Sequence, residues 1–227
     1  TGRDGGMNPG PSLELFGHPF SSYTWKVLIA LYAYEVPFTF RMVGADHPEN
    51  VEVVQTAGPQ GKFPVLRDGE NLLFETTSIL EYLDRHHIGA GTLIPEDPDA
   101  ATAIRMLDRV FDNYVMNVMQ VVVDEHIRSP AAPDLARCAE ARGRLERSYA
   151  WLEGWLQFYP AMDQVTLIEC AAAPSLFYAD WVHPIPEELP RLRQWRARLL
   201  ALPPVARCVD EARPYRSYFP LGAPDRD

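Results

Sequence analysis

Four hydroxyl-bearing residues stand side by side near the start of the chain, as Ser21-Ser22-Tyr23-Thr24. They open the segment 22–34, whose apolar residues recur with helical spacing, so their hydroxyls are predicted at the positive end of a helix dipole. A hydroxyl there can donate a hydrogen bond to a bound sulfur and favour its thiolate. A free thiol titrates at about pH 8.5, and lowering its pKa by about one unit requires roughly 1.4 kcal/mol, which one charge-assisted hydrogen bond can supply. The ordinary alternative is helix capping, and the sequence leaves open which of the four would face a sulfur.

A second set of candidate residues lies in two short segments, Lys62-Phe63-Pro64 and Glu75-Thr76. A cis proline at position 64 would present the backbone of Phe63 to an extended peptide ligand, which two main-chain hydrogen bonds could hold. Glu75 can pair with an ammonium, while Thr76 and the first amides of the following helix can hold a carboxylate. Lys62 is a candidate for another ligand carboxylate. Together these groups fit a small peptide with a free glutamyl end.

Each of these residues also has an ordinary interpretation. Pro64 could be a trans proline that opens an edge strand, because only about 5–6% of X–Pro bonds are cis. Glu75-Thr76 could be a plain helix start, and Lys62 a solvated surface lysine. The spacing between the proline segment and the Glu-Thr pair favours the binding interpretation.

The segments around these residues alternate between strand and helix. A strand, a helix and a strand within about 30 residues predict a parallel strand pair. Asp68-Gly69 between two apolar runs is a strong hairpin signal. We therefore predict strands at 12–17, 38–43, 64–67 and 71–74 and helices at 22–34 and 77–86, in the order βαβ followed by ββα.

From about residue 97 onward the apolar pattern is entirely helical. Thr166-Leu167-Ile168-Glu169 fits a capping box at the start of a nearly all-apolar helix, in which Pro174 predicts a kink or a local break. The tail at 214–227, rich in Pro, Arg and Tyr, is predicted to be irregular. We expect two domains, at 12–88 and 97–220, with a disordered or tag-derived start at 1–11.

Composition narrows the function classes. The 227 residues carry a formal net charge of −10, which disfavours nucleic-acid binding and anionic membrane surfaces. No apolar run reaches the roughly 18 residues of a membrane span. The three cysteines, at 138, 170 and 208, lack metal-ligand spacing and are expected to be buried thiols in a reducing cytoplasm. We assign no metal.

The three chemistry-bearing segments together resemble the soluble glutathione S-transferases, and the resemblance covers nearly the whole chain. The run from Ser21 is similar to the Ser-Ser-Cys-Ser-Trp-Arg-Val motif of zeta-like and related bacterial members. By this resemblance Ser21 activates glutathione and Ser22 assists, while Phe63-Pro64 replaces the family's Val-Pro and Glu75-Thr76 its Glu/Gln-Ser pair. The implied fold is a thioredoxin-like α/β N-terminal domain followed by an all-α helical-bundle C-terminal domain.

The resemblance implies a glutathione transferase, with glutathione as co-substrate, an apolar electrophile as second substrate and a homodimeric assembly. Tyr114, Val118, Tyr178 and Tyr215 are the candidate walls of the electrophile site. Tyr23 stands where the zeta motif has cysteine, which weakens an assignment as maleylacetoacetate isomerase. Glu169 stands where the helical box usually has aspartate.

Other functions on the same fold stay open. A glutathione-dependent isomerase or peroxidase would use the same first site, and the sequence cannot separate these from a conjugating enzyme. A non-catalytic assembly module is the alternative outside enzymes, although such members usually lose the Glu-Ser pair or the hydroxyl cluster, and both are present here.

Overall fold

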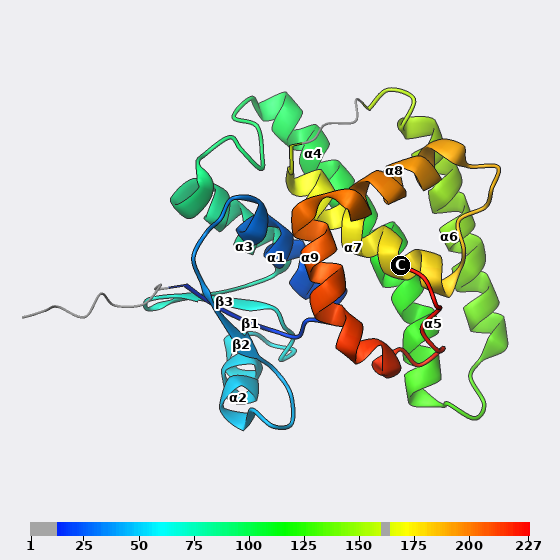
Figure 1. Cartoon of the computed structure of the whole chain (residues 1–227), viewed down its shortest axis with the longest axis horizontal. Helices are drawn as coiled ribbons and strands as arrows, with labels where there is room; N and C mark the ends of the chain where they lie inside the picture. Colours follow the sequence, from blue (N-terminus) through cyan, green and yellow to red (C-terminus); the bar gives the residue numbers. More distant parts are fainter. Residues whose placement is uncertain (1–12, 160–163) are drawn as a thin grey trace, which may run out of the picture.

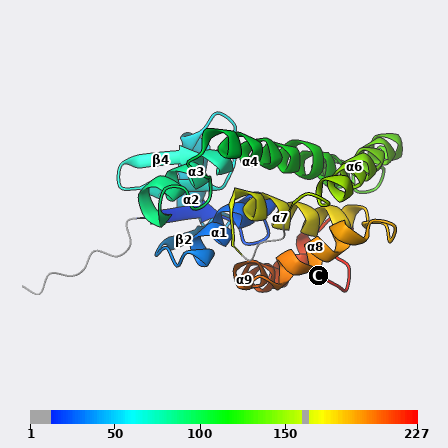
Figure 2. The same ribbon diagram turned by 90° about the horizontal axis from the view of Figure 1, so that it is seen from above.

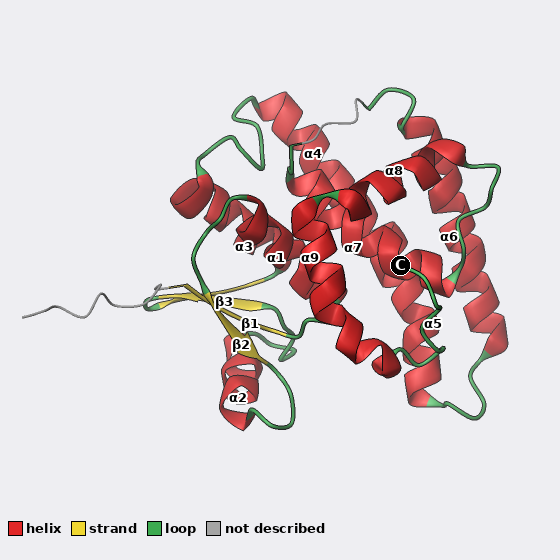
Figure 3. Ribbon diagram, viewed as in Figure 1, coloured by secondary structure: helices red, strands yellow, loops and turns green. Residues whose placement is uncertain are grey.

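A four-stranded mixed sheet is the centre of the N-terminal part of the chain. The structure, a computed structural model, describes residues 13–159 and 164–227, so the expectation for 1–11 lies outside the described residues. The strand order is β2-β1-β3-β4; β1 pairs in parallel with β2 and antiparallel with β3, which pairs antiparallel with β4. The strands are β1 (Leu13–Gly17), β2 (Thr39–Met42), β3 (Val65–Asp68) and β4 (Asn71–Phe74) (Figure 3). All four predicted strands are therefore present.

Helices cover both faces of the sheet (Figure 1). Because side chains alternate along a strand, Leu13 and Leu15 of β1 face the cluster that contains α1 (Ser22–Ala33) and α3 (Thr76–Leu83). Phe16 joins a separate cluster with Val54 of α2 (Pro48–Ala57). The π-helical segment η1 (Asp84–Ile88) continues α3.

The helix α2 was not predicted from the sequence. Pro48 stands in its first turn, but its apolar face is weak, with Asn50 and Val54 as its buried residues. An apolar stripe this narrow gives no clear helical period.

The rest of the described chain is helical. The long central helix α7 is buried along its whole length and packs against α1, α4, α5, α8 and η2. No break interrupts it at Pro174, and both halves of the predicted capping box at Thr166 and Glu169 are present. The tail is not wholly irregular as predicted, because residues 213–218 form a 3-10 helix. The elements are α4 (Pro98–Val110), η2 (Phe111–Met116), α5 (Asn117–Arg128), α6 (Leu135–Trp155), α7 (Leu167–Val182), α8 (Pro190–Ala201), α9 (Pro203–Ala212) and η3 (Arg213–Tyr218).

The link between the sheet and the helical bundle is fixed by one buried carboxylate. Asp84 accepts hydrogen bonds from the amides of Gly91, Thr92 and Leu93, at 3.2, 3.1 and 2.7 Å. The carbonyl of Leu93 in turn accepts a hydrogen bond from the amide of Leu167, at the start of α7.

The helices α3, α4 and α6 follow one another along one side of the molecule when it is seen from above (Figure 2). Of the helices in the described residues, none is long and apolar enough to cross a membrane.

Candidate functional site

The hydroxyl of Ser21 stands at the start of α1 and bonds to the first turn of the helix. Ser21 is the N-cap residue, with extended backbone, and its Oγ accepts a hydrogen bond from the amide of Thr24 at 3.3 Å. Across residues 13–159 and 164–227, this hydroxyl donates to no partner. Ser21 therefore caps the helix as an acceptor and keeps its O–H for a ligand at the positive helix end.

Close contact between β1 and α1 holds this helix start in place. Thr24 is buried and its Oγ1 accepts a hydrogen bond from the amide of His18 at 3.3 Å. A Cβ atom on Gly17 would lie 2.7 Å from the Thr24 side chain, a distance that real Cβ contacts do not reach. Glycine at position 17 is what allows the strand and the helix to approach so closely.

The proline segment lies where the sequence predicts it. The Phe63-Pro64 peptide bond is cis, and β3 begins at Val65. Pro64 is buried, while Lys62 before it is exposed.

Glu75 has an unusual backbone conformation at the start of α3. Its φ of 68° and ψ of 112° lie where residues other than glycine are rarely found. Its side chain makes no capping hydrogen bond to the helix and is exposed, whereas Thr76 beside it is buried. Strain of this kind costs about 1–3 kcal/mol and is concentrated at functional sites, so Glu75 is a candidate site residue on its backbone alone.

Two adjoining concavities contain most of the predicted residues. The first, which we call the inner pocket, has a volume of 310 Å³. It is lined by Tyr23, Gly58, Pro59, Gln60, Lys62, Phe63, Pro64, Phe74, Glu75, Thr76, Arg109, Asp112, Asn113 and Asn117. The five residues predicted to bind glutathione are thus brought together in one pocket.

The second concavity, which we call the outer hollow, has a volume of 670 Å³. It is lined by His18, Phe20, Ser21, Met42, Val43, Gly44, Ala45, Asp46, His47, Phe63, Gln120, Ile127, Tyr215 and Tyr218. Phe63 lines both spaces, and Ser21 lies on the outer side. Phe63 is thus the residue that the two spaces share.

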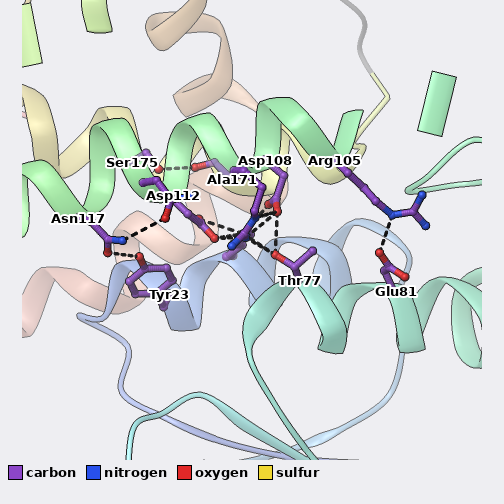
Figure 4. A network of polar contacts seen from close by, with 12 residues as sticks. Tyr23, Thr77, Glu81, Arg105, Asp108, Asp112, Asn117, Ala171 and Ser175 are labelled. Atoms are coloured by element: carbon purple, nitrogen blue, oxygen red, sulfur yellow. Dashed lines mark hydrogen bonds and ion pairs between the residues drawn. The ribbon is translucent and has the colours of Figure 1, made fainter. Parts of the chain in front are cut away.

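A network of charged side chains lies behind the inner pocket (Figure 4). The Lys26 ammonium of α1 lies 2.5 Å from Asp108 and 2.9 Å from Asp112. Both aspartates also pair with Arg109, which donates to the hydroxyl of Thr77 as well. Burial raises the pKa of Asp112, the positive charge of Lys26 opposes this rise and Asp108 adds to it. The network fixes the Arg109 guanidinium at the wall of the inner pocket.

Tyr23 takes a different place from Ser21. Its hydroxyl donates to Asn117 at 2.8 Å, in the inner pocket. Burial, followed by the negative charge of Asp112, raises the pKa of Tyr23, so the phenol keeps its proton at neutral pH. Ser22 is buried and lines neither concavity.

The four predicted wall residues have separate positions. Tyr215 lines the outer hollow. Val118 and Tyr178 lie in the core, with 2% and 4% of their surface exposed, and Tyr114 is 57% exposed. Tyr178 donates a hydrogen bond to the carbonyl of Phe20 at 2.7 Å, so it supports the wall of the hollow from behind.

Several residues at these spaces were not predicted as site residues. They are His18, Arg109, Asp112, Asn113, Asn117 and Tyr218. His18 lies three residues before Ser21, and this closeness in the sequence was the available signal. The α4, η2 and α5 residues carry no such signal, since they are linked to α1 through contacts across the fold, such as the pairs Lys26–Asp112 and Tyr23–Asn117.

The cysteines offer no nucleophile to these spaces. Cys138, Cys170 and Cys208 are free thiols and all are buried. Burial raises the pKa of Cys170 and of Cys208, which keeps both as thiols. No group of three or more His, Cys, Asp or Glu side chains suited to a metal ion occurs in the part of the chain that the structure describes.

Comparison with known proteins agrees with this architecture. Residues 15–91 match the family model described as glutathione S-transferase, N-terminal domain. A glutathione S-transferase from Pseudomonas putida is 29% identical over 160 residues, which cover 69% of this chain and 70% of the relative. A probable maleylacetoacetate isomerase from Vibrio cholerae is 27% identical over 215 residues, covering 89% and 98% of the two chains.

A solved structure extends the similarity to three dimensions. A glutathione S-transferase from Methylobacterium radiotolerans, in complex with glutathione sulfonate, has a TM-score of 0.72 and 25% identity, covering 87% of this chain and 94% of the other. The described residues thus form a thioredoxin-like domain followed by a helical one. Residues 15–91 thus match a glutathione S-transferase N-terminal domain, and the chain as a whole is similar in sequence and fold to soluble glutathione S-transferases.

Proposed function

We propose that the protein is a glutathione transferase that binds reduced glutathione in the inner pocket and activates its sulfur with Ser21. The observation that carries this proposal is the position of Phe63, which lines both concavities, with the free Ser21 hydroxyl on the outer side. A cysteine held by the backbone of Phe63 would direct its sulfur toward Ser21 and the positive end of α1.

The remaining groups of the inner pocket match the two ends of glutathione. Glu75 pairs with the glutamyl ammonium, while Thr76 and the first amides of α3 hold the glutamyl carboxylate. Lys62 meets the glycyl carboxylate at the other end. Arg109, already held by two aspartates, adds a positive charge on the glutamyl side of the pocket.

Ser21 would stabilise the thiolate without becoming covalently attached. Its O–H donates to the sulfur, and the sulfur attacks an electrophile held in the outer hollow. Tyr23 is the weaker candidate because its proton is engaged by Asn117. Ser22 contributes through the packing of the helix start, since it is buried.

A glutathione-dependent isomerase is the second candidate function. The Vibrio cholerae relative that carries the name probable maleylacetoacetate isomerase favours it. Tyr23, in place of the zeta cysteine, argues against it. A transferase and an isomerase would bind glutathione in the same inner pocket, and so would a glutathione-dependent peroxidase. A non-catalytic module has less support, because the site residues are assembled.

We also propose that the protein is a homodimer in a reducing, cytoplasmic compartment. Three large apolar side chains are exposed on β4 and α4, namely Leu72, Phe74 and Met106, and a second copy would cover them. The free, buried cysteines suit a compartment in which thiols stay reduced. Light scattering behind a sizing column tests the dimer, and a mass of one chain would reject it.

Calorimetric titration with reduced glutathione tests the proposed function. Repeating the titration in two buffers of different ionisation heat measures the protons released on binding. Binding with proton release supports both the site and the activated thiol, and no binding at millimolar glutathione rejects the proposal.

A pair of variants locates the site. Thr76→Val removes one hydroxyl from the inner pocket and is expected to weaken binding about tenfold, or 1.4 kcal/mol. The control is Thr56→Val, because the Thr56 hydroxyl bonds to the backbone of its own helix α2 and lies outside the pocket. Equal affinities of the two variants would remove Thr76 from the site.

A further inference from the structure

The ring of His18 is held in one orientation at the wall of the outer hollow. Its Nδ1 accepts a hydrogen bond from the amide of Phe20 at 3.1 Å. Its own amide donates to Thr24, so the residue is fixed to the chain on two sides. The ring also meets the ring of Tyr215 edge-on, with 4.7 Å between the centroids.

This hydrogen bond determines where the imidazole carries its proton. A backbone amide can only donate, so Nδ1 must be the unprotonated nitrogen, and the neutral ring carries its proton on Nε2. Burial lowers the pKa of His18, which favours the neutral ring at neutral pH. Nε2 is the ring nitrogen farther from the main chain. It has no hydrogen-bond partner among the residues that the structure describes.

The hollow beside this ring has a large aromatic and apolar share, next to the polar side chains of Asp46, His47 and Gln120. Phe20, Phe63 and Ile127 contribute apolar surface to the hollow, and Tyr215 and Tyr218 lie against the His18 ring. An unpaired donor in such surroundings is suited to an aromatic molecule with a single acceptor oxygen. Ser21 lies in the same hollow, so that molecule would be next to the glutathione sulfur.

We propose that His18 is a catalytic residue for the second substrate, and that this substrate is an aromatic α,β-unsaturated ketone or aldehyde whose carbonyl oxygen accepts a hydrogen bond from Nε2–H. The proposal rests on the proposed function, because the attacking sulfur is that of bound glutathione. The tautomer of His18 and the residues that line the hollow support it.

The reaction balances without an oxidant or reductant. The thiolate forms a bond to the β-carbon, the C=C π bond breaks, and its electron pair moves onto the carbonyl oxygen as an enolate. The Nε2–H hydrogen bond stabilises that oxyanion as charge develops on it. The α-carbon then takes a proton from water, and this replaces the proton that the thiol released to water on binding.

Two variants separate the donor from the structural role of His18. In His18→Asn the side-chain oxygen can accept from the Phe20 amide two residues on, as Asx turns do, but the Nε2–H is lost. In His18→Gln the longer amide can place an N–H near the position of Nε2, while the contact to Phe20 is lost. If His18 acts as a donor, His18→Asn should lose activity toward the carbonyl substrate and His18→Gln should keep most of it. If His18 has only a structural role, His18→Gln should lose activity and His18→Asn should keep it.

The measurement is the selectivity for 4-phenyl-3-buten-2-one over benzyl chloride, expressed as the ratio of the two kcat/KM values. Benzyl chloride is aromatic and reacts with glutathione, but it has no oxygen on which charge develops. Losing one oxyanion donor costs about 10²–10³-fold in an enclosed site, so about 10–100-fold is expected in an open hollow. His18→Asn should lower the ratio by that amount, and His18→Gln should restore most of it.

The outcomes distinguish this proposal from the function on which it rests. A ratio within threefold of the wild type in His18→Asn would overturn the role of His18, as would recovery in Asn but not in Gln. Wild-type protein that binds glutathione and converts benzyl chloride but not the enone would overturn the substrate class alone. If glutathione does not bind, the proposed function itself fails, and this inference with it.

Discussion

The ammonium of Lys26 and the carboxylate of Asp108 form an ion pair at 2.5 Å, and neither side chain is exposed to solvent. Lys26 belongs to α1, whose first turn carries Ser21, and Asp108 belongs to α4 in the helical half of the chain. The pair therefore joins α1, which is capped by Ser21, to α4, which contributes Arg109 to the inner pocket.

Replacing Lys26 by methionine should be strongly destabilising. The change leaves the buried Asp108 and Asp112 with the half-exposed Arg109 in place of a fully buried cation, and breaking a buried ion pair in this way costs about 3–5 kcal/mol. Urea unfolding followed by circular dichroism measures the free energy of unfolding. The matched control is Arg105→Met, which removes the more exposed ion pair with Glu81, also drawn in Figure 4. This change should cost at most about 1 kcal/mol. Similar losses in the two variants would contradict this interpretation of the buried pair.

The Ser21→Ala variant should lower turnover and leave glutathione affinity within a few fold. Without the hydroxyl, the pKa of the bound thiol rises by about one unit, so about tenfold less thiolate is present at pH 7. The deficit should shrink as the pH rises above about 8.5, because the thiol then ionises unaided. Steady-state rates from pH 6.5 to 9.5 measure this. A deficit that is constant across the range would rule out thiolate stabilisation by Ser21.

A second N-cap residue controls for the loss of the Ser21 cap. Asp97 caps α4 by accepting from the amide of Ala100 at 2.8 Å, and it lines neither concavity. Asp97→Ala should lose about 1 kcal/mol of stability, as Ser21→Ala does, but should keep its turnover. If turnover falls equally in both variants, stability and not chemistry explains the effect.

Glu14 should give the protein part of its sensitivity to acid. Burial would raise the pKa of this carboxyl, but hydrogen bonds from Arg41 and Arg67 outweigh it and lower the pKa below its ordinary value. A lowered pKa in the folded state means that the stabilisation is complete above the ordinary value of 4.5 and is lost as the pH falls through the lowered one. Glu14→Gln should thus be less stable than the wild type at pH 7, and the gap should close in acid. A gap that widens on acidification would contradict the assignment.

Asp84→Ala should loosen the link between the two halves of the chain. Three amides lose their acceptor, and the expected cost is about 2–4 kcal/mol. Hydrogen exchange should become faster at Gly91, Thr92 and Leu93 in particular. Asp134→Ala is the control, because Asp134 accepts from one amide, that of Arg137, at an exposed helix start. Unchanged exchange at the three amides would show that the link is held by other contacts.

The sequence predicts elements whose signals are local. The capping box at Thr166 and Glu169 was predictable because both halves of the motif lie within four residues, and all four strands were predictable from their β-branched and apolar runs. The helix α2 was missed because Asn50 and Val54 are its only fully buried residues, while Val51, Val53 and Ala57 are partly exposed. The short helix in the tail was missed because Pro214 and the following aromatic residues have no helical period.

The candidate site divides in the same way. Ser21, Phe63 and Glu75 stand in short motifs, so the sequence was sufficient to nominate them. Arg109 and Asp112 lie at the inner pocket next to residues far away in the sequence, as in the ion pair of Asp112 with Lys26, and no local pattern encodes such contacts. For Val118 and Tyr178 the helical period identifies a buried face, but it does not distinguish the core from the wall of a cavity.

The hydrogen bond from Tyr178 to the carbonyl of Phe20 has a consequence for the adaptation of this protein to new substrates. Tyr178 lies on the buried helix α7, and Phe20 immediately precedes Ser21. A substitution that reshapes the outer hollow through α7 will therefore also displace Ser21, the residue that we propose to activate the sulfur. Substrate range and nucleophile strength would be inherited together, and directed evolution toward a bulkier electrophile should require compensating changes around positions 18–21.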